Sequence, residues 1–260
     1  MNILCLGDIV GRPGRAALEA LLPALKEEHA VDLVIVNAEN AAGGAGVSSR
    51  IAKHILSFGI DVLTLGDHVW DKKDLEDYLK EADRVIRPAN FPPEDPGKGY
   101  CIIESAKGIK VGVVNLMGRV FMRYHLACPF RTLENIVEDI KKTTPVIVVD
   151  MHAEATSEKV ALGHFIDGKV SCVFGTHTHI QTADEKILPQ GTAYITDLGM
   201  CGPYDSVIGQ DKDKILQRFL TSMPVKFEVA QAAGTLHGVV VTVDETNGQA
   251  QSIIRIQQGE

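Results

Sequence analysis

The feature that most constrains the fold is a regular alternation of apolar runs with amphipathic stretches along most of the chain. Apolar runs typical of buried strands cover residues 3–6, 33–36, 62–65, 111–116, 146–149 and 170–174. Amphipathic segments lie between them, and helices are expected at 15–28, 48–58, 132–142 and 212–220. Pro13 suits the first turn of the first helix, and Ser48 or Ser49 suits the N-cap of the second. This order is typical of βαβ units, so the fold class is α/β.

The pattern changes at two places. Residues 87–99 are rich in proline and glycine, so we expect a surface loop between two βα halves. Near the C-terminus, residues 226–229, 236–243 and 252–256 read as strands, and Asn247-Gly248 indicates a hairpin turn. No repeat or linker divides the chain. We therefore predict one domain over residues 1–260 that ends in antiparallel strands.

Composition narrows the class of partner. The net charge of −8 leaves no basic surplus for gripping a long nucleic acid, whereas a small anion could bind where cations neutralise a site. No run of about 18 apolar residues appears and the chain opens directly into a strand, so we expect a cytoplasmic protein with no membrane partner. The five cysteines are scattered without C-x-x-C spacing, which favours reduced thiols over disulfides or a zinc knot.

Polar side chains of the metal-ligand type follow five of the predicted strands. Each has a structural reading by itself, as an N-cap, a turn residue or a solvated polar group. Because the carboxyl ends of parallel strands meet at one edge of a sheet, we expect these side chains to converge on one site. The candidate ligands are Asp8, Glu39, Asn40, Asp67, His152, His177 and His179.

This ligand set favours two metal ions over one. Seven groups exceed the needs of a tetrahedral zinc, but they suit a pair of five- or six-coordinate ions that share a bridging carboxylate. Two divalent ions bring four positive charges and the three carboxylates remove three, so about one positive charge is left to attract a phosphodiester anion. Mixed oxygen and imidazole ligation suits iron or manganese and does not exclude zinc.

Five blocks of the chain, taken in order, resemble those of the calcineurin-like metallophosphoesterases. The blocks are Gly7-Asp8, Glu39-Asn40, Gly66-Asp67-His68, His152, and Gly175-Thr176-His177-Thr178-His179. Longer segments are similar to the YmdB branch of that superfamily, whose members are 2',3'-cyclic-nucleotide 2'-phosphodiesterases. These segments are residues 7–15, Asn37-Ala38-Glu39-Asn40, His68-Val69-Trp70-Asp71 and residues 152–159. The resemblance extends over nearly the whole chain, and its motifs are specific in combination.

The resemblance implies a four-layer α/β/β/α sandwich with mixed sheets and a dimetal site at its edge. It also implies which side chains surround each ion. One ion would be held by Asp8, Glu39, Asn40 and His179, and the other by Glu39, Asp67, His152 and His177, with Glu39 bridging. The implied substrate is a small phosphodiester or a 2',3'-cyclic nucleotide, cleaved to the 3'-nucleotide, with RNA ends as a further substrate. Family members also imply a homo-oligomer.

Three positions depart from the wider superfamily. Val10 stands where the first block usually has a histidine, and Glu39 stands where most members have aspartate; both fit the YmdB-like branch. Asp67 stands where the wider pattern and much of the branch have asparagine. This additional carboxylate should strengthen metal binding and weaken the attraction for an anionic substrate.

The expected chemistry is attack of a metal-bound hydroxide on phosphorus, in line with the leaving oxygen. His68 is then the natural general acid, because it follows Asp67 and because the family pattern supports that role; a further metal ligand or a packed imidazole is the alternative. Trp70 could stack on a nucleobase or serve as a packing anchor. Arg12, Arg15, Arg119 and Arg123 could contact phosphate or base, although solvated surface charge is the simpler interpretation.

Other functional classes compete with a phosphodiesterase. Residues 7–14 superficially suggest a phosphate-binding loop, but they lack the G-K-[ST] ending that such a loop needs. An amidohydrolase would carry its H-x-H motif on the first strand, whereas this motif follows the sixth. A non-enzymatic or weakly active regulator that binds a phosphorylated ligand at a retained dimetal site is the remaining alternative, and Asp67 is the residue that favours it.

The general-acid role of His68 generates a first prediction. The His68→Ala variant should retain its metal, because His68 is not among the seven ligands, and should lose most of its turnover of a phosphodiester. Metal analysis of the purified variant, together with a steady-state assay, measures both quantities. Turnover at the wild-type rate would refute the assignment.

Overall fold

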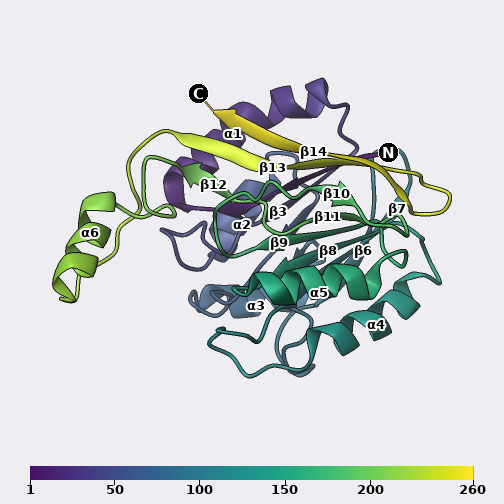
Figure 1. The fold of residues 1–260 in the computed structure, drawn as a ribbon, viewed down its shortest axis with the longest axis horizontal. Coiled ribbons are helices and arrows are strands. Elements are labelled where there is room, and N and C mark those ends of the chain that lie inside the picture. Colours follow the sequence, from purple (N-terminus) through teal and green to yellow (C-terminus); the bar gives the residue numbers. More distant parts are fainter. Residues whose placement is uncertain (260) are drawn as a thin grey trace.

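The apolar runs form two mixed β-sheets that pack face to face, as the computed structural model of residues 1–259 shows (Figure 1). The first sheet has the spatial order β2 (Asp8–Ile9), β12 (Met200–Pro203), β13 (Gly234–Val243), β1 (Asn2–Leu6), β3 (Leu33–Asn37), β4 (Val62–Thr64) and β5 (Val85–Ile86), and β14 (Ala250–Gly259) pairs with β13. The second sheet has the order β10 (Lys186–Ile187), β11 (Ala193–Ile195), β9 (Cys172–Thr176), β8 (Ile147–His152), β7 (Lys110–Met117) and β6 (Tyr100–Glu104).

Helices cover the outer face of each sheet, which completes four layers. The first sheet packs against α1 (Gly11–Glu28), α2 (Ser49–Leu56) and α3 (Asp74–Glu81), and the second against α4 (Pro129–Ile140) and α5 (Thr156–Ile166). A sixth helix, α6 (Lys212–Thr221), stands away from these layers at the left of Figure 1. The expected α/β/β/α sandwich is confirmed.

The strand period of two explains how one chain builds three apolar cores. In β1, Leu4 and Leu6 face the helices of the first sheet, while Ile3 and Cys5 face the second sheet. Successive side chains of a strand point to opposite faces, so a strand that is buried on both sides is apolar throughout. This is why the strands appear in the sequence as continuous apolar runs rather than as alternating patterns.

The structure confirms the six predicted apolar strands and corrects several other expectations. Residues 226–229 do not form a strand, because the segment is joined to its surroundings by an isolated bridge between Gln210 and Val229 rather than by a neighbouring strand. Residues 87–99 do form a loop, but Arg87 is buried in it and donates hydrogen bonds to the carbonyl oxygens of Pro88, Pro92, Asp95 and Pro96. The sequence pattern does not predict α3, α5 or the short strands β2, β5, β6, β10, β11 and β12.

The two sheets present the carboxyl ends of their parallel strands at a common edge. Strands β1, β3 and β4 are parallel in the first sheet, and β7, β8 and β9 are parallel in the second. At this edge the sheets are joined by polar contacts. Thr64 Oγ1 and Asn37 Nδ2 of the first sheet donate to Asp150 Oδ2 of the second, at 2.5 and 3.1 Å.

No helix within residues 1–259 has the length and apolar character needed to cross a membrane.

Thiol labelling tests this burial pattern. Cys5, Cys101, Cys172 and Cys201 are buried free thiols, and Cys128 is partly exposed. Burial raises the pKa of Cys172 and Cys201 to about 12, which removes the reactive thiolate at neutral pH. At pH 7.5 we expect one rapidly reacting thiol per native chain with 5,5'-dithiobis-(2-nitrobenzoate), and five after denaturation. The Cys128→Ser variant is the control and should lose the rapid phase; a rapid phase that persists would contradict the packing of the cores.

Candidate metal centre

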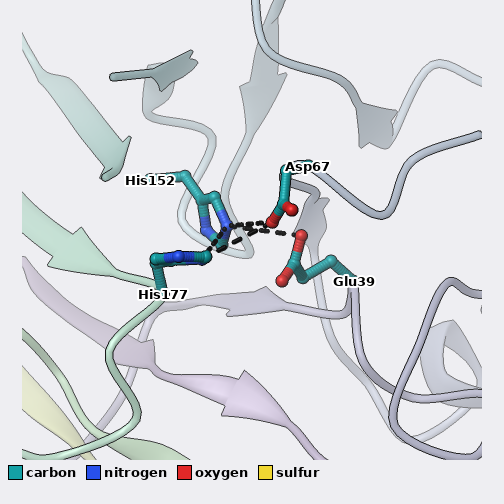
Figure 2. A group of neighbouring side chains, drawn as sticks. All are labelled: Glu39, Asp67, His152 and His177. Atoms are coloured by element: carbon teal, nitrogen blue, oxygen red, sulfur yellow. Dashed lines mark hydrogen bonds and ion pairs between the residues drawn. The ribbon is translucent and has the colours of Figure 1, made fainter. Parts of the chain in front are cut away.

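Four of the predicted ligands point toward one another at the common edge (Figure 2). Glu39 and Asp67 follow β3 and β4, His152 ends β8, and His177 follows β9. His152 Nε2 lies 3.3 Å from Glu39 Oε2 and 3.3 Å from Asp67 Oδ1. His177 Nδ1 lies 3.0 Å from His152 Nε2. One ligand atom from each residue falls within 4.8 Å of the others, so this group could hold a metal ion.

The three other predicted ligands lie beside this four-residue group. Asn40 Nδ2 donates to Glu39 Oε1 at 2.9 Å and lies 3.1 Å from His179 Nε2. His179 Nε2 is 3.9 Å from Asp8 Oδ1. The ligand atom of an asparagine is its amide oxygen, so metal binding at Asn40 would require the amide to turn over. All seven predicted residues are therefore brought together, because Asp8 Oδ1 also lies 3.9 Å from His152 Nδ1.

The carboxylates are crowded and buried. Burial, followed by the charge of Asp197, raises the pKa of Asp8 to about 7. Burial also raises the pKa of Glu39, and the charges of Asp67 and Asp8 add to the effect. At Asp67 burial acts in the same direction, but the neighbouring imidazoles of His152 and His177 outweigh it and lower the pKa of this carboxyl group. Negative charge is thus concentrated at this edge, and the neighbouring histidines balance it only in part.

Three further observations show that these residues fit metal ions. Asp8 Oδ1 is buried and has no hydrogen-bond partner within residues 1–259, and an unpaired buried carboxylate oxygen is costly unless a cation contacts it. A β-carbon at Gly66 would collide with Glu39 Oε2 and His152 Nε2, so glycine is needed to let the ligands gather. Burial also lowers the pKa of His152 to about 3, which keeps the imidazole in the neutral form that binds metal.

Hydrogen bonds orient the imidazole of His152. Thr176 Oγ1 donates to Asp150 Oδ1 at 2.7 Å and lies 2.9 Å from His152 Nδ1. Because the threonine proton is used on Asp150, Thr176 Oγ1 accepts from His152 Nδ1, and His152 Nε2 is left with a lone pair for the centre. Asp150 is not among the predicted site residues, although its position two residues before His152 at the end of β8 is a signal that could have identified it.

The segment that carries His177 and His179 is strained and needs support. Both histidines have positive φ angles, 97° and 66°, which residues other than glycine rarely adopt. Asp197 Oδ2 accepts from Thr178 N at 3.2 Å and from Thr178 Oγ1 at 2.7 Å. Lys159, itself buried, contacts the same oxygen at 2.6 Å. Asp197 follows β11 as the ligands follow their strands, so a predicted strand at 193–195 would have revealed it.

The predicted general acid, His68, lies next to the four-residue group rather than within it. Its backbone N–H donates to Glu39 Oε2 at 3.2 Å, and its ring Nδ1 is 2.7 Å from Asp71 Oδ2. The His68 side chain lines a cavity of ≈ 600 Å³ together with Glu39 and His177. It is therefore placed to act on a molecule in the cavity.

The predicted surroundings of two side chains near His68 can be compared with the structure, and the prediction is wrong for one and agrees for the other. Arg123, expected to be solvated, is 3.1 Å from Asp71 Oδ1 and donates to the carbonyl oxygen of Asp67, so it supports the centre. Trp70 packs edge to face on Phe91 with 5.7 Å between ring centroids, as a packing anchor does.

Comparison with known proteins agrees with this geometry. A 2',3'-cyclic-nucleotide 2'-phosphodiesterase from Bacillus subtilis (strain 168) is 46% identical over 256 residues, which cover 98% of this chain and 96% of the relative. A crystal structure of a hypothetical protein from Thermus thermophilus has a TM-score of 0.92 at 40% identity and covers 100% of both chains. A crystal structure described as a novel phosphatase, from Mycoplasma pneumoniae, has a TM-score of 0.91 at 35% identity and covers 100% of this chain and 94% of the other.

The sandwich fold and the cluster of acidic and imidazole groups define a phosphoester hydrolase of the metallophosphoesterase class. A family model described as "YmdB-like protein" matches residues 4–256. The chain belongs to this YmdB-like family, as the resemblance of its motifs predicts.

The buried pair of Lys159 and Asp197 generates a prediction on stability. Lys159→Met leaves the Asp197 charge buried without its cation, so the free energy of unfolding should fall by about 3–5 kcal/mol in urea titrations. Lys80→Met is the matched control, because Lys80 makes a 2.7 Å ion pair with Asp77 at the surface and should have little effect. Equal effects of the two substitutions would contradict the bracing role of Lys159.

Proposed function

We propose that the chain is a dinuclear metal-dependent phosphodiesterase that hydrolyses small phosphodiesters, in particular 2',3'-cyclic nucleotides to 3'-nucleotides. The observation that carries the proposal is the gathering of Glu39, Asp67, His152 and His177 within 4.8 Å, with Asp8 Oδ1, which has no hydrogen-bond partner within residues 1–259, 3.9 Å from His152 Nδ1. The Bacillus subtilis relative is named for this reaction, and its similarity covers nearly all of both chains. Family, ligand chemistry and charge balance thus support the same class of substrate.

The two groups of ligands support two positions for metal ions. Asp8, Asn40 and His179 would hold one ion, Asp67, His152 and His177 would hold the other, and Glu39 would bridge them. When bound, such ions activate water for attack at phosphorus and neutralise charge on the phosphoryl oxygens. Mixed carboxylate and imidazole ligation favours iron or manganese and is compatible with zinc.

His68 is suited to protonate the leaving 2'-oxygen of the ribose. Its ring lies at the wall of the cavity, beside Glu39 and His177. Asp71 Oδ2 lies 2.7 Å from ring Nδ1, which orients the imidazole, and in the protonated ring Nε2–H is then free to donate to the substrate. Arg123 contacts Asp71 in turn, at 3.1 Å. The chain Arg123, Asp71, His68 therefore positions one proton donor at the cavity.

A second candidate function follows from Asp67. The carboxylate of Asp67 adds negative charge to a centre that has to attract an anion, which favours a weakly active or non-enzymatic regulator that binds a phosphorylated ligand. A cytoplasmic location is a further proposal that rests on the sequence pattern, and self-association and action on RNA ends are further proposals that come with the family resemblance.

Reconstitution with metal separates the two functions. Protein loaded with manganese should hydrolyse bis-p-nitrophenyl phosphate and 2',3'-cyclic AMP, and EDTA should abolish both activities. The variant Gly66→Ala places a methyl group among the ligands, so its metal content and its turnover should fall by about 100-fold or more. Far-UV circular dichroism of Gly66→Ala, compared with EDTA-treated wild type, checks that the fold is kept. Tight binding of a nucleotide by the metal-loaded protein without hydrolysis of either ester would overturn the enzyme and support the regulator.

A further inference from the structure

The cavity beside the candidate metal centre is lined by two chemically different sets of residues. One set is polar and includes Glu39, His68 and His179. The other set is aromatic and consists of Phe219 of α6 and Phe227 of the segment that follows it. The volume of ≈ 600 Å³ is in the range of pockets for small ligands. A ligand that fills this space would place one end at the metal centre and the other end at an apolar wall.

The apolar wall is formed by aromatic rings that remain open to solvent. The exposed fraction is 78% for Phe219 and 44% for Phe227. The guanidinium of Arg218 lies 4.7 Å from the centroid of the Phe227 ring. Aromatic rings beside a cationic group are the usual platform on which proteins stack unpaired nucleobases, because every base has a π-face.

The backbone near the aromatic wall allows close approach. Gly44 lines the same cavity with a φ angle of +90°, a conformation that other residues rarely adopt. A β-carbon at Gly44 would lie 3.0 Å from Gln210 Nε2 and 3.1 Å from Val229 Cγ2. Glycine therefore keeps this part of the cavity open, and the amide of Gln210 offers hydrogen bonds to the edge of a base.

A hydrogen bond ties the segment that precedes α6 to His179 of the candidate metal centre. The carbonyl oxygen of Ile208 accepts from His179 Nδ1 at 2.9 Å, and Ile208 also lines the cavity. Three residues later Asp211 caps α6, with its side chain accepting from Lys214 N at 3.1 Å. The short, hydrogen-bonded segment from Ile208 to Asp211 thus fixes where α6 begins relative to His179.

We propose that this cavity is a nucleobase subsite, in which Phe219 and Phe227 stack on the base of a nucleotide whose phosphate lies at the metal centre. The proposal rests on the proposed function, because the cyclic phosphate has to bind beside His68 for the base to reach α6. It identifies Phe219 and Phe227 as residues that determine specificity for nucleotides over other phosphodiesters.

The test compares two substrates that differ only in the base. One is 2',3'-cyclic AMP, and the other is the same ribose cyclic phosphate with a methoxy group in place of adenine. In the manganese-loaded protein, Phe219→Ala and Phe227→Ala should each raise KM for cyclic AMP about tenfold, with little change in kcat. Neither variant should change KM for the substrate without a base. Phe219→Tyr retains the ring and should behave like wild type.

Leu220→Ala is the matched control. Leu220 is an exposed apolar residue of the same helix, 83% accessible, and it is not among the residues that line the cavity. This variant should leave KM for both substrates unchanged. If Leu220→Ala and Phe219→Ala raise KM for both substrates alike, or if both change the molar mass by light scattering, α6 serves folding or assembly and the proposal is overturned.

A binding measurement keeps the subsite testable without turnover. Calorimetry with adenosine 3'-monophosphate should show about tenfold weaker binding to Phe219→Ala than to wild type, whereas binding of inorganic phosphate should be unchanged. Equal affinities of adenosine 3'-monophosphate for wild type and variant would overturn the subsite. Failure of wild type to hydrolyse either cyclic phosphate, with this difference in binding retained, would instead overturn the proposed function alone.

Discussion

The repulsion among the buried carboxylates at the sheet edge is the constraint on which the rest of this structure depends. Asp8, Glu39 and Asp67 are held close together, and both burial and mutual repulsion raise the pKa of Glu39. The neighbouring histidines supply only part of the missing positive charge, since burial lowers the pKa of His152 to about 3 and keeps it neutral. A carboxylate oxygen such as Asp8 Oδ1, buried without a partner within residues 1–259, is tolerated where a cation can reach it. Metal binding at this edge would therefore relieve the repulsion among the buried carboxylates.

The candidate metal centre is built across two sheets. Ligands come from the ends of both sheets, so their spacing depends on how the sheets pack. Asp150 of β8 fixes that packing locally, because it accepts hydrogen bonds from Thr64 and Asn37 of the first sheet and from Thr176 of the second. The buried pair of Lys159 and Asp197 does the same for the segment between His177 and His179. Buried polar networks of this kind give geometric precision when every member is paired.

Sequence reasoning was most successful where one local pattern decides the outcome. An apolar run predicts a doubly buried strand, and a polar residue at its end predicts a place on the carboxyl edge; Glu39, Asp67 and His152 follow from these two rules. The same reasoning failed for residues 226–229, because a strand also needs a partner along its length, and here Gln210 pairs with Val229 only in an isolated bridge. It missed Asp197 because the three-residue strand β11 is too short to stand out as an apolar run. Arg123 was undervalued for a related reason, since its partners Asp67 and Asp71 are distant in the chain.

The amino-acid sequence by itself determined the fold class, the edge of the sheets where the candidate ligands lie and the seven side chains offered there, because strand periodicity and strand-end position are local properties. Only the tertiary structure decided which of these side chains meet, which imidazole nitrogen faces the centre and which groups brace it. Those outcomes depend on contacts between segments far apart in the chain, such as Asn37 with Asp150 or Lys159 with Asp197. The aromatic wall formed by Phe219 and Phe227 was likewise decided only by the tertiary structure. Phe219 and Phe227 are ordinary apolar residues in the sequence, and they line a cavity with His68 only because the fold returns that segment to the metal centre.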